Sequence, residues 1–314
     1  MLLRSLRDWL VYALVRVFIC IIQTLRIETC HVVAKLLAFV ACDVTRMRYA
    51  VIEDNVRHVF PQWDAVRRRR FIRLSWEHLF LMVAEAAHAR RKIHQTSFRK
   101  YVEFANKPLL LEYMLDPRAV VLVTGHYGNF EVAGYVMGMF GFPSTSIARQ
   151  LDNPYLDRYI NRVRASAGQW ILPKQGCAPQ VDAVLRAGGT LSLLGDQHAG
   201  EKGCWVDFLG RPASCHKAVA LFTLSSGAPQ LVSYLRRTDK PMRFEIGVVG
   251  VADPREWDPQ LASVPALTRW YNDRLGEMIL EAPEQYWWVH RRWKGHPPAR
   301  RKRAIQPPDQ AKVA

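Results

Sequence analysis

The sequence predicts an α/β fold: a mostly parallel central sheet flanked by helices, with an N-terminal helical segment that associates with a membrane. Two short apolar runs, residues 120–123 and 190–194, are typical of buried parallel strands. Each run leads into glycine and then polar residues, and helical patterns lie between the two runs. In open α/β sheets, ligands and catalytic groups collect beyond the carboxyl ends of such strands.

The N-terminal region carries two apolar runs, Trp9–Ile22 and His31–Cys42, which are interrupted by Arg16 and Lys35. Each run is shorter than the roughly 20 residues that a bilayer span needs. Three interpretations stay open: one anchor helix whose arginine reaches a headgroup, two amphipathic helices in the interface, or a soluble helical hairpin packed on the protein. The basic residues on either side of the runs favour a membrane with anionic headgroups.

Net charge and composition limit the classes of partner that we expect. The 314 residues include 44 Lys and Arg against 28 Asp and Glu, a formal net charge of +16, so we expect anionic partners. Ten tryptophans fit a protein at a membrane interface. The sequence offers no zinc finger or base-stacking motif, so we expect no nucleic acid partner. The six cysteines show no metal-binding spacing, and we expect no metal.

The remaining elements follow from apolar patterns and their boundaries. Residues 49–103 are helical and basic in pattern, and residues 203–213 are loop-like. Asn153-Pro154 marks a helix start, and Gly188-Gly189 marks a helix stop. We expect strands at 120–123, 145–148, 190–194, 230–235 and 243–249, the last two as a hairpin, and helices at 132–140, 154–165, 181–186, 217–225 and 265–281.

The clearest candidates for catalytic residues are His126 and Glu131. They lie in the phrase H-Y-G-N-F-E after the first buried strand. On one continuous helix, residues five apart would point roughly 140° away from each other, at about 100° per residue. They can converge only across a turn, and Gly125 and Gly128 supply one. We expect the Glu131 carboxylate to hold one imidazole nitrogen, leaving the other free to take a proton from a hydroxyl. Such a general base suits attack of an alcohol or amine on an activated acyl group.

This phrase resembles the His-x-x-x-x-Glu motif of the glycerolipid acyltransferase superfamily. In the form H-[FY]-G-N-[WF]-E it resembles the bacterial lipid A biosynthesis acyltransferases, the late lauroyl and myristoyl transferases. Further family phrases match in order: N-x-x-x-x-F-P at 55–61, an arginine followed by N-P-x-x-D at 149–157, D-Q followed by G-x-x-V-x-F-x-G-x-P-A at 196–213, and P-E-Q-Y-W-W-V-H-R-R-W-K at 283–294. We therefore divide the chain into a membrane-associating segment at 1–44, an acyltransferase domain at 45–296 and a basic flexible tail at 297–314.

The resemblance implies an O-acyltransferase at the cytoplasmic side of the bacterial inner membrane. Its donor would be a fatty acyl thioester of acyl carrier protein or coenzyme A, with no other cofactor. Its acceptor would be a hydroxyl of a phosphorylated glycolipid, best matched by a lipid A precursor. His126 would take the hydroxyl proton and Glu131 would orient His126, without an acyl-enzyme. The resemblance assigns substrate binding to Arg149, Asn153, Arg164 (with Arg162 as its rival), Asp196, Gln197 and Arg211.

Other functions stay open on the sequence alone. The acceptor could be a lysophospholipid or another bacterial lipid, which product analysis would distinguish. The chain could also be a membrane-binding protein without activity, or a metal hydrolase that a chelator would inhibit. Ser192 and Cys204 lack the sequence context of an activated nucleophile. The arginines could be solvent-exposed charges, and Asp196 could be only a loop or helix cap.

Overall fold

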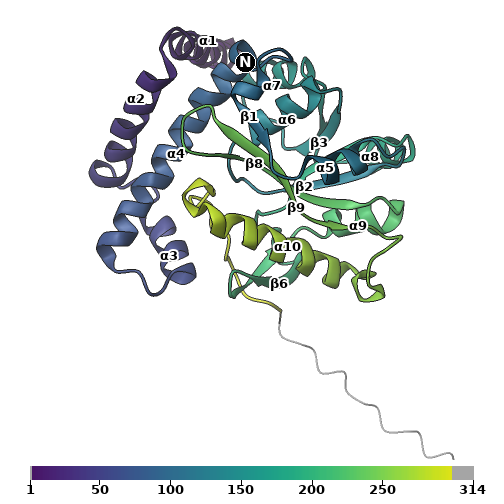
Figure 1. Cartoon of the computed structure of the whole chain (residues 1–314). Coiled ribbons are helices and arrows are strands. Elements are labelled where there is room, and N and C mark those ends of the chain that lie inside the picture. Colours follow the sequence, from purple (N-terminus) through teal and green to yellow (C-terminus); the bar gives the residue numbers. More distant parts are fainter. Residues whose placement is uncertain (1, 299–314) are drawn as a thin grey trace, which may run out of the picture.

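A seven-stranded sheet forms the centre of the protein, whose computed structural model describes residues 2–298 (Figure 1). The strand order is β1-β9-β8-β2-β5-β3-β4. All neighbouring strands are parallel except β8 and β9, which form an antiparallel hairpin. The predicted α/β class is therefore confirmed. The strands are β1 (Val102–Phe104), β2 (Val120–Thr124), β3 (Ser144–Ala148), β4 (Gln169–Pro173), β5 (Thr190–Leu194), β8 (Gln230–Arg237) and β9 (Phe244–Ala252).

Helices cover both faces of this sheet (Figure 1). Alternate residues of β2 enter different cores: Val120 and Leu122 pack with the first group of helices, and Val121 and Val123 with the second. Burial on both faces explains why this strand is apolar throughout. The first group is α5 (Lys107–Met114), α6 (Phe130–Met139) and the C-terminal half of α4 (Ala65–Lys92). The second is α8 (Ala178–Arg186), α9 (Lys217–Ser226), α10 (Val264–Glu281) and the N-terminal half of α4.

The connections place a switch point between β2 and β5. Helix α6 leads from β2 to β3, and α7 (Pro154–Ala165) leads from β3 to the edge strand β4. Helix α8 then returns along the opposite face to β5, which lies beside β2, and the chain continues to β8 on the other side of β2. Because the chain leaves β2 and β5 toward opposite edges, their carboxyl ends border a crevice suited to ligands.

Four strands were not expected from the sequence. Residues 203–213 were expected to be loop, but they form most of the hairpin of β6 (Cys204–Phe208) and β7 (Arg211–Cys215). Its two-residue turn has positive φ at Leu209 (53°) and Gly210 (83°), the geometry of a type I′ turn. Leucine is rare at a position with positive φ, so the sequence analysis did not predict this turn. The short edge strands β1 and β4 were also missed; β1, V-E-F, is too short for its alternation to stand out from the helical pattern around it.

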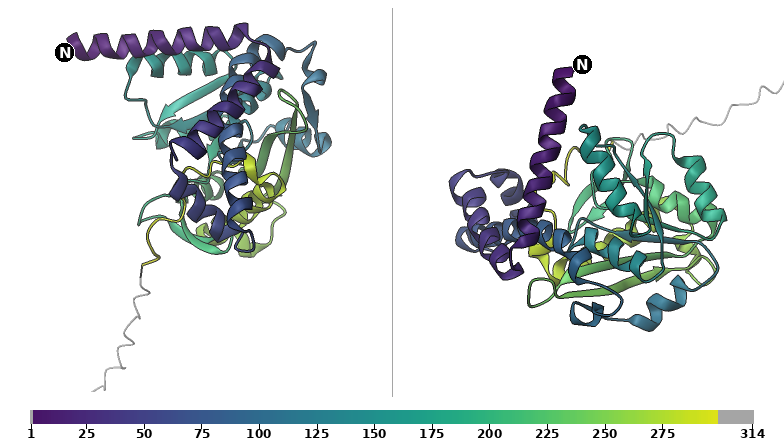
Figure 2. Two further views of the ribbon diagram at one scale, coloured as in Figure 1. Left: turned by 90° about the vertical axis from the view of Figure 1, so that its left-hand side faces the viewer. Right: turned by 90° about the horizontal axis from the view of Figure 1, so that it is seen from above.

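The N-terminal third is helical: α1 (Leu2–Thr24), α2 (Ile27–Phe39), the π-helix η1 (Val40–Val44) and α3 (Tyr49–Val59). Helix α1 lies along α7, and α2 runs along the outer side of α4 (Figure 2). Within residues 2–298, none of the helices is at once long and apolar enough to cross a membrane. The domain boundary at residue 44 stays a prediction, and the predicted flexible tail at 297–314 falls almost wholly outside the described residues. Short 3-10 helices are η2 (Phe98–Lys100), η3 (Pro259–Leu261) and η4 (Pro283–Gln285).

Candidate active site

His126 and Asp196 form a hydrogen-bonded pair at the carboxyl ends of β2 and β5. The two strands pair with Thr124 opposite Leu194, so each site residue lies two positions beyond the paired end. The Nδ1 of His126 is 2.8 Å from Asp196 Oδ1, and the His126 backbone N–H donates to Asp196 Oδ2 at 2.9 Å. Gly125 leaves the space for this approach, since a Cβ there would lie 3.3 Å from the Asp196 carboxyl carbon.

The hydrogen bonds determine which imidazole nitrogen is basic. An ionised Asp196 can only accept, so the Nδ1 of His126 carries the proton and Nε2 keeps its lone pair. The Gln197 side-chain nitrogen is 3.2 Å from Nε2, where its amide N–H can donate to that lone pair. A hydroxyl that took the place of the Gln197 amide would face a nitrogen that is ready to receive its proton.

His126 and Asp196 each shift the pKa of the other. Burial of the His126 ring lowers its pKa, but the charge and hydrogen bond of Asp196, with the charge of Glu131, outweigh burial and raise the pKa above its ordinary value. Burial raises the pKa of Asp196, yet the charge and hydrogen bonds of His126, with the charge of Arg292, bring it below the ordinary range. At neutral pH the carboxylate is therefore ionised, and it stabilises the imidazolium that proton transfer creates.

Glu131 has a different partner from the one expected. It lies in the first turn of α6, as predicted. Its carboxylate accepts from Arg164 of α7 in a two-bond ion pair, with Nε at 3.1 Å from Oε2 and Nη2 bonded to Oε1. The prediction that Glu131 holds the His126 ring is therefore wrong, because Asp196 occupies Nδ1. Glu131 still acts on His126 through its charge, which raises the histidine pKa.

An apolar cavity opens beside this ion pair. It lies between α6 and the sheet, and both Glu131 and Arg164 line it. Its sheet wall carries small side chains on three of the strands, Ser146 on β3, Ser192 on β5 and Ser233 on β8, which leave room that larger residues would fill. Apolar residues form most of the remaining wall: Leu110, Leu122, Phe130, Met137, Phe142 and Ile171. A linear apolar chain fits this lining, with its polar end at the carboxyl edge of the sheet.

The structure does not bring the other predicted binding residues to His126. Arg149 is exposed and pairs with Asp152 at 2.8 Å. Asn153 caps α7 with its Oδ1, and its Nδ2 donates to the backbone of α1 at 2.7 Å. Arg211, at the start of β7, lies 3.7 Å from Asp54 of α3. Substrate binding by these three residues stays a prediction.

The C-terminal segment completes the wall around His126. The Trp287 backbone N–H donates to His126 O at 3.0 Å, and the Trp287 ring meets the imidazole edge-on at 5.4 Å between centroids. Phe130 flanks the ring on another side at 5.2 Å. Tyr127 pairs with Tyr286 in an isolated β-bridge. The segment at 283–294 therefore supports the turn that carries His126, a role that the sequence analysis did not assign.

Two further features bear on charge and metal binding. Arg292 is buried behind Asp196 and donates to Ser214 O at 2.7 Å and Asn272 Oδ1 at 3.2 Å. Its charge helps to keep Asp196 ionised. Across residues 2–298, no group of three or more His, Cys, Asp or Glu side chains is arranged to hold a metal ion.

Comparisons with known proteins give matches along almost the whole chain. A sequence model of the family described as "Bacterial lipid A biosynthesis acyltransferase" matches residues 1–295. The chain is 24% identical over 255 residues to the lipid A biosynthesis palmitoleoyltransferase of Escherichia coli (strain K12), covering 80% of each chain. It is 22% identical over 258 residues to the lipid A biosynthesis lauroyltransferase of the same strain, covering 80% of this chain and 81% of that one. The family match includes the strands, turn and C-terminal segment that build the site.

Proposed function

The chain belongs to the family of bacterial lipid A biosynthesis acyltransferases, and we propose that it transfers a fatty acyl chain from an acyl thioester to a hydroxyl of a phosphorylated lipid A precursor. The observation that carries the proposal is the His126–Asp196 pair, whose imidazole ring packs against Phe130, a residue that lines the apolar cavity. The pair supplies a base, and the cavity supplies a site for an acyl chain. The relatives' names support lipid A as the acceptor class.

The reaction follows from these positions. The acceptor hydroxyl replaces the Gln197 amide at Nε2 of His126 and gives up its proton to that nitrogen. The oxygen attacks the thioester carbonyl, and the C–S bond then breaks. The departing thiolate takes the proton from the imidazolium, which restores the neutral ring. The ester forms directly, without an acyl-enzyme.

Arg164 places a positive charge at the mouth of the cavity. Two hydrogen bonds to Glu131 fix its guanidinium, so binding a second anion costs little side-chain entropy. From this place it can stabilise the oxyanion of the attacked carbonyl or contact a phosphate of the acceptor. We propose that the Glu131–Arg164 pair serves this purpose.

The function is tested with purified protein, acyl donors and mixed-lipid vesicles that contain an acylated, phosphorylated glucosamine disaccharide. Mass spectrometry should show this acceptor gaining one acyl chain, with acyl-acyl carrier protein and acyl-coenzyme A in parallel reactions to identify the donor. Vesicles with a lysophospholipid in place of the disaccharide test the alternative acceptor. Acylation of the lysophospholipid alone would overturn the lipid A proposal.

Replacing Arg164 with methionine is expected to lower kcat/KM by about 10- to 100-fold, the effect of losing a charged group that acts in the transition state. The measurement is the initial rate of acyl transfer at subsaturating acceptor. Arg162→Met is the matched control, because Arg162 lies on the same helix and is exposed. Equal losses in the two variants would contradict a specific role for Arg164.

Replacing Ser192 with leucine is expected to shorten the preferred acyl chain by several carbons. Ser192 lies in the middle of β5 and lines the cavity, so a larger side chain fills space along the path of the acyl chain. Competition among donors of graded chain length, read by mass spectrometry of the product, measures the preference. Ser225→Leu, on the exposed side of α9, is the control, and an unchanged preference in Ser192→Leu would argue against this cavity as the acyl site.

We also propose that α1 and α2 lie in the membrane interface. Arg16, which interrupts the first apolar run, turns inward and lies 4.5 Å from the ring of Tyr159 on α7. The outward side of α1 is therefore left apolar, and α2 continues with exposed apolar residues. Arg4 and Arg7 at the start of α1 are exposed and complement anionic headgroups. The exposed large apolar residues are Leu6, Trp9, Leu10, Val11, Leu14, Val17, Phe18 and Ile21 on α1, and Val32, Val33, Leu36, Leu37 and Phe39 on α2.

A double variant with Leu14→Glu and Leu36→Glu should bind anionic vesicles at least about 10-fold more weakly. Each substitution removes a leucine whose burial in the membrane contributes roughly 1.5 to 3 kcal/mol of binding free energy. It also adds a negative charge that anionic headgroups repel. Sedimentation with vesicles measures the bound fraction. Leu115→Glu, a change at a leucine that is 69% exposed just after α5, controls for added charge. Unchanged binding of the double variant would exclude these faces as the membrane contact.

A further inference from the structure

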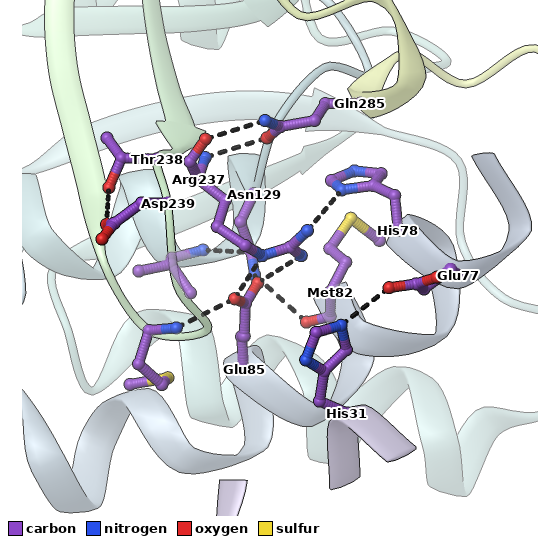
Figure 3. A network of polar contacts seen from close by, with 12 residues as sticks. His31, Glu77, His78, Met82, Glu85, Asn129, Arg237, Thr238, Asp239 and Gln285 are labelled. Atoms are coloured by element: carbon purple, nitrogen blue, oxygen red, sulfur yellow. Dashed lines mark hydrogen bonds and ion pairs between the residues drawn. The ribbon is translucent and has the colours of Figure 1, made fainter. Parts of the chain in front are cut away.

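A buried ion pair lies directly behind the turn that joins His126 to α6 (Figure 3). Glu85 of α4 has no exposed surface. Arg237, at the carboxyl end of β8, donates to both Glu85 oxygens, from Nε at 2.6 Å and from Nη2 at 2.8 Å. Buried ion pairs are poor stabilising devices, because the desolvation of two charges offsets their attraction. The contacts of this pair indicate a different use.

Asn129, in the turn, is held by α4 and β8. Its side-chain Nδ2 donates to Glu85 Oε2 at 3.2 Å and to Met82 O at 3.1 Å. Its Oδ1 caps α6 by accepting from the Val132 backbone N–H at 3.2 Å, and its own backbone N–H donates to Leu235 O at 2.8 Å. Every polar group of the Asn129 side chain is thus engaged, and the start of α6 is fixed against α4.

Gly128, the preceding residue, is held through Arg237. The Gly128 N–H donates to Gln285 O at 3.0 Å. The Gln285 amide in turn makes two bonds of 2.8 Å, one accepting from the Arg237 backbone N–H and one donating to the Arg237 carbonyl. Gly128 has φ of +58°, and a Cβ there would collide with the carbonyl oxygen of Leu235. The turn can therefore adopt this shape only while β8 and the C-terminal segment stay in place.

His78 of α4 is a further contact of Arg237. Arg237 Nη1 lies 3.2 Å from His78 Nδ1. Burial, followed by the charge of Arg237, holds the pKa of His78 well below its ordinary value, so the ring is neutral. A neutral ring can accept the Arg237 N–H at Nδ1, which helps to fix the guanidinium against α4.

We propose that Glu85 and Arg237 are positioning residues for acyl transfer. Together they hold the Gly128–Asn129 turn in the conformation that places His126 on Asp196. The inference rests on the proposed function for its kinetic consequences, but the geometry it describes does not depend on the substrate. Neither side chain is assigned a contact with substrate, and both act through the backbone and cap of the turn.

The test is a double variant, Glu85→Leu with Arg237→Met, which removes both charges together so that neither is left buried and unpaired. We expect kcat to fall about 10- to 100-fold, the effect of a small misplacement of a catalytic group, with KM for the acyl donor within about twofold of the native value. The matched control is Arg118→Met with Asp253→Leu. In that pair Asp253 is buried and Arg118 is half-buried, with a 2.8 Å bond between them, and the pair lies at the amino end of β2, the end away from His126.

The decisive readout is the titration of His126, followed by NMR of the imidazole without substrate. Loss of positioning weakens the contact with Asp196, so the His126 pKa should fall in the Glu85/Arg237 variant and stay unchanged in the control. Arg237→Lys keeps the charge but loses the two-bond geometry, so the His126 pKa should fall by an intermediate amount in this variant. This variant serves as the test if the double variant does not fold. A native His126 pKa in a folded variant would overturn the proposal, whether or not the protein acylates lipid A.

Discussion

Replacing His126 with glutamine is expected to lower kcat by about three orders of magnitude, within the range of roughly 10² to 10⁴ for removal of a general base. The Nε2 lone pair of His126 is the proton acceptor in the proposed reaction, and a glutamine amide cannot take that proton at neutral pH. The measurement is the single-turnover rate of acyl transfer to the glycolipid at saturating donor and acceptor.

The control for this variant is His58→Gln. His58 is half-buried outside the site, and its Nε2 lies 3.1 Å from the Leu209 carbonyl oxygen. This variant should keep native kcat, and thermal unfolding should show that both variants are folded. Retention of more than about a tenth of the native rate in His126→Gln would mean that another group accepts the proton, and the proposed mechanism would then be abandoned.

Much of the fold follows from apolar patterns that the sequence shows directly. The strand at 190–194 and the helix at 154–165 were predicted with the bounds that the structure shows, because glycine and proline mark their ends. The hairpin β6–β7 could not be predicted, since Leu209 occupies a left-handed position that leucine rarely adopts. Its conformation depends on the hairpin around it rather than on local preference.

Of the residues named from the sequence, His126, Asp196 and Gln197 lie together in the structure, but their pairing was not predicted. His126 and Glu131 lie only five residues apart, and this proximity in sequence suggested a direct bond. Asp196 is 70 residues away, and only the neighbouring positions of β2 and β5 bring it to His126. A sequence signal was present: both strands end in glycine followed by the site residue, as T-G-H and L-G-D. Strand order, which the sequence does not specify, is needed to use it.

The contacts of Glu131 divide the acidic roles between two carboxylates. Asp196 is 2% exposed and binds the ring of His126 directly, whereas Glu131 is 31% exposed and binds Arg164 at the cavity. The buried carboxylate is suited to holding a tautomer, since water does not compete for its bonds. The more exposed one is suited to placing a cation where the substrate enters. The His-x-x-x-x-Glu spacing thus connects His126, the proposed base, to the Glu131–Arg164 ion pair through one short turn.

The pH dependence distinguishes these roles. His126 acts as a base only when neutral, and its pKa lies above the ordinary value of about 6.5. The rate should therefore rise with pH through a midpoint above that value. Because Asp196 is the largest of the influences that raise this pKa, removing its charge should move the midpoint to lower pH.

Asp196→Asn should therefore lower kcat by roughly 10²- to 10³-fold and shift the rising limb of the pH profile of kcat/KM to lower pH. The loss of rate follows from the two hydrogen bonds that Asp196 now accepts from His126. In the variant the amide oxygen takes the backbone N–H, which leaves the NH₂ group facing Nδ1. The ring must then carry its proton on Nε2, the nitrogen that should accept the proton of the hydroxyl.

Asp182→Asn, which changes an exposed carboxylate on α8, is the matched control and should leave both rate and midpoint unchanged. A lowered rate with an unmoved midpoint in Asp196→Asn would point to substrate binding as the role of Asp196, as the sequence first suggested. A midpoint that moves downward while the rate falls can arise only if the carboxylate acts through the imidazole. The direction of the shift therefore separates a residue that binds the acceptor from one that holds the base.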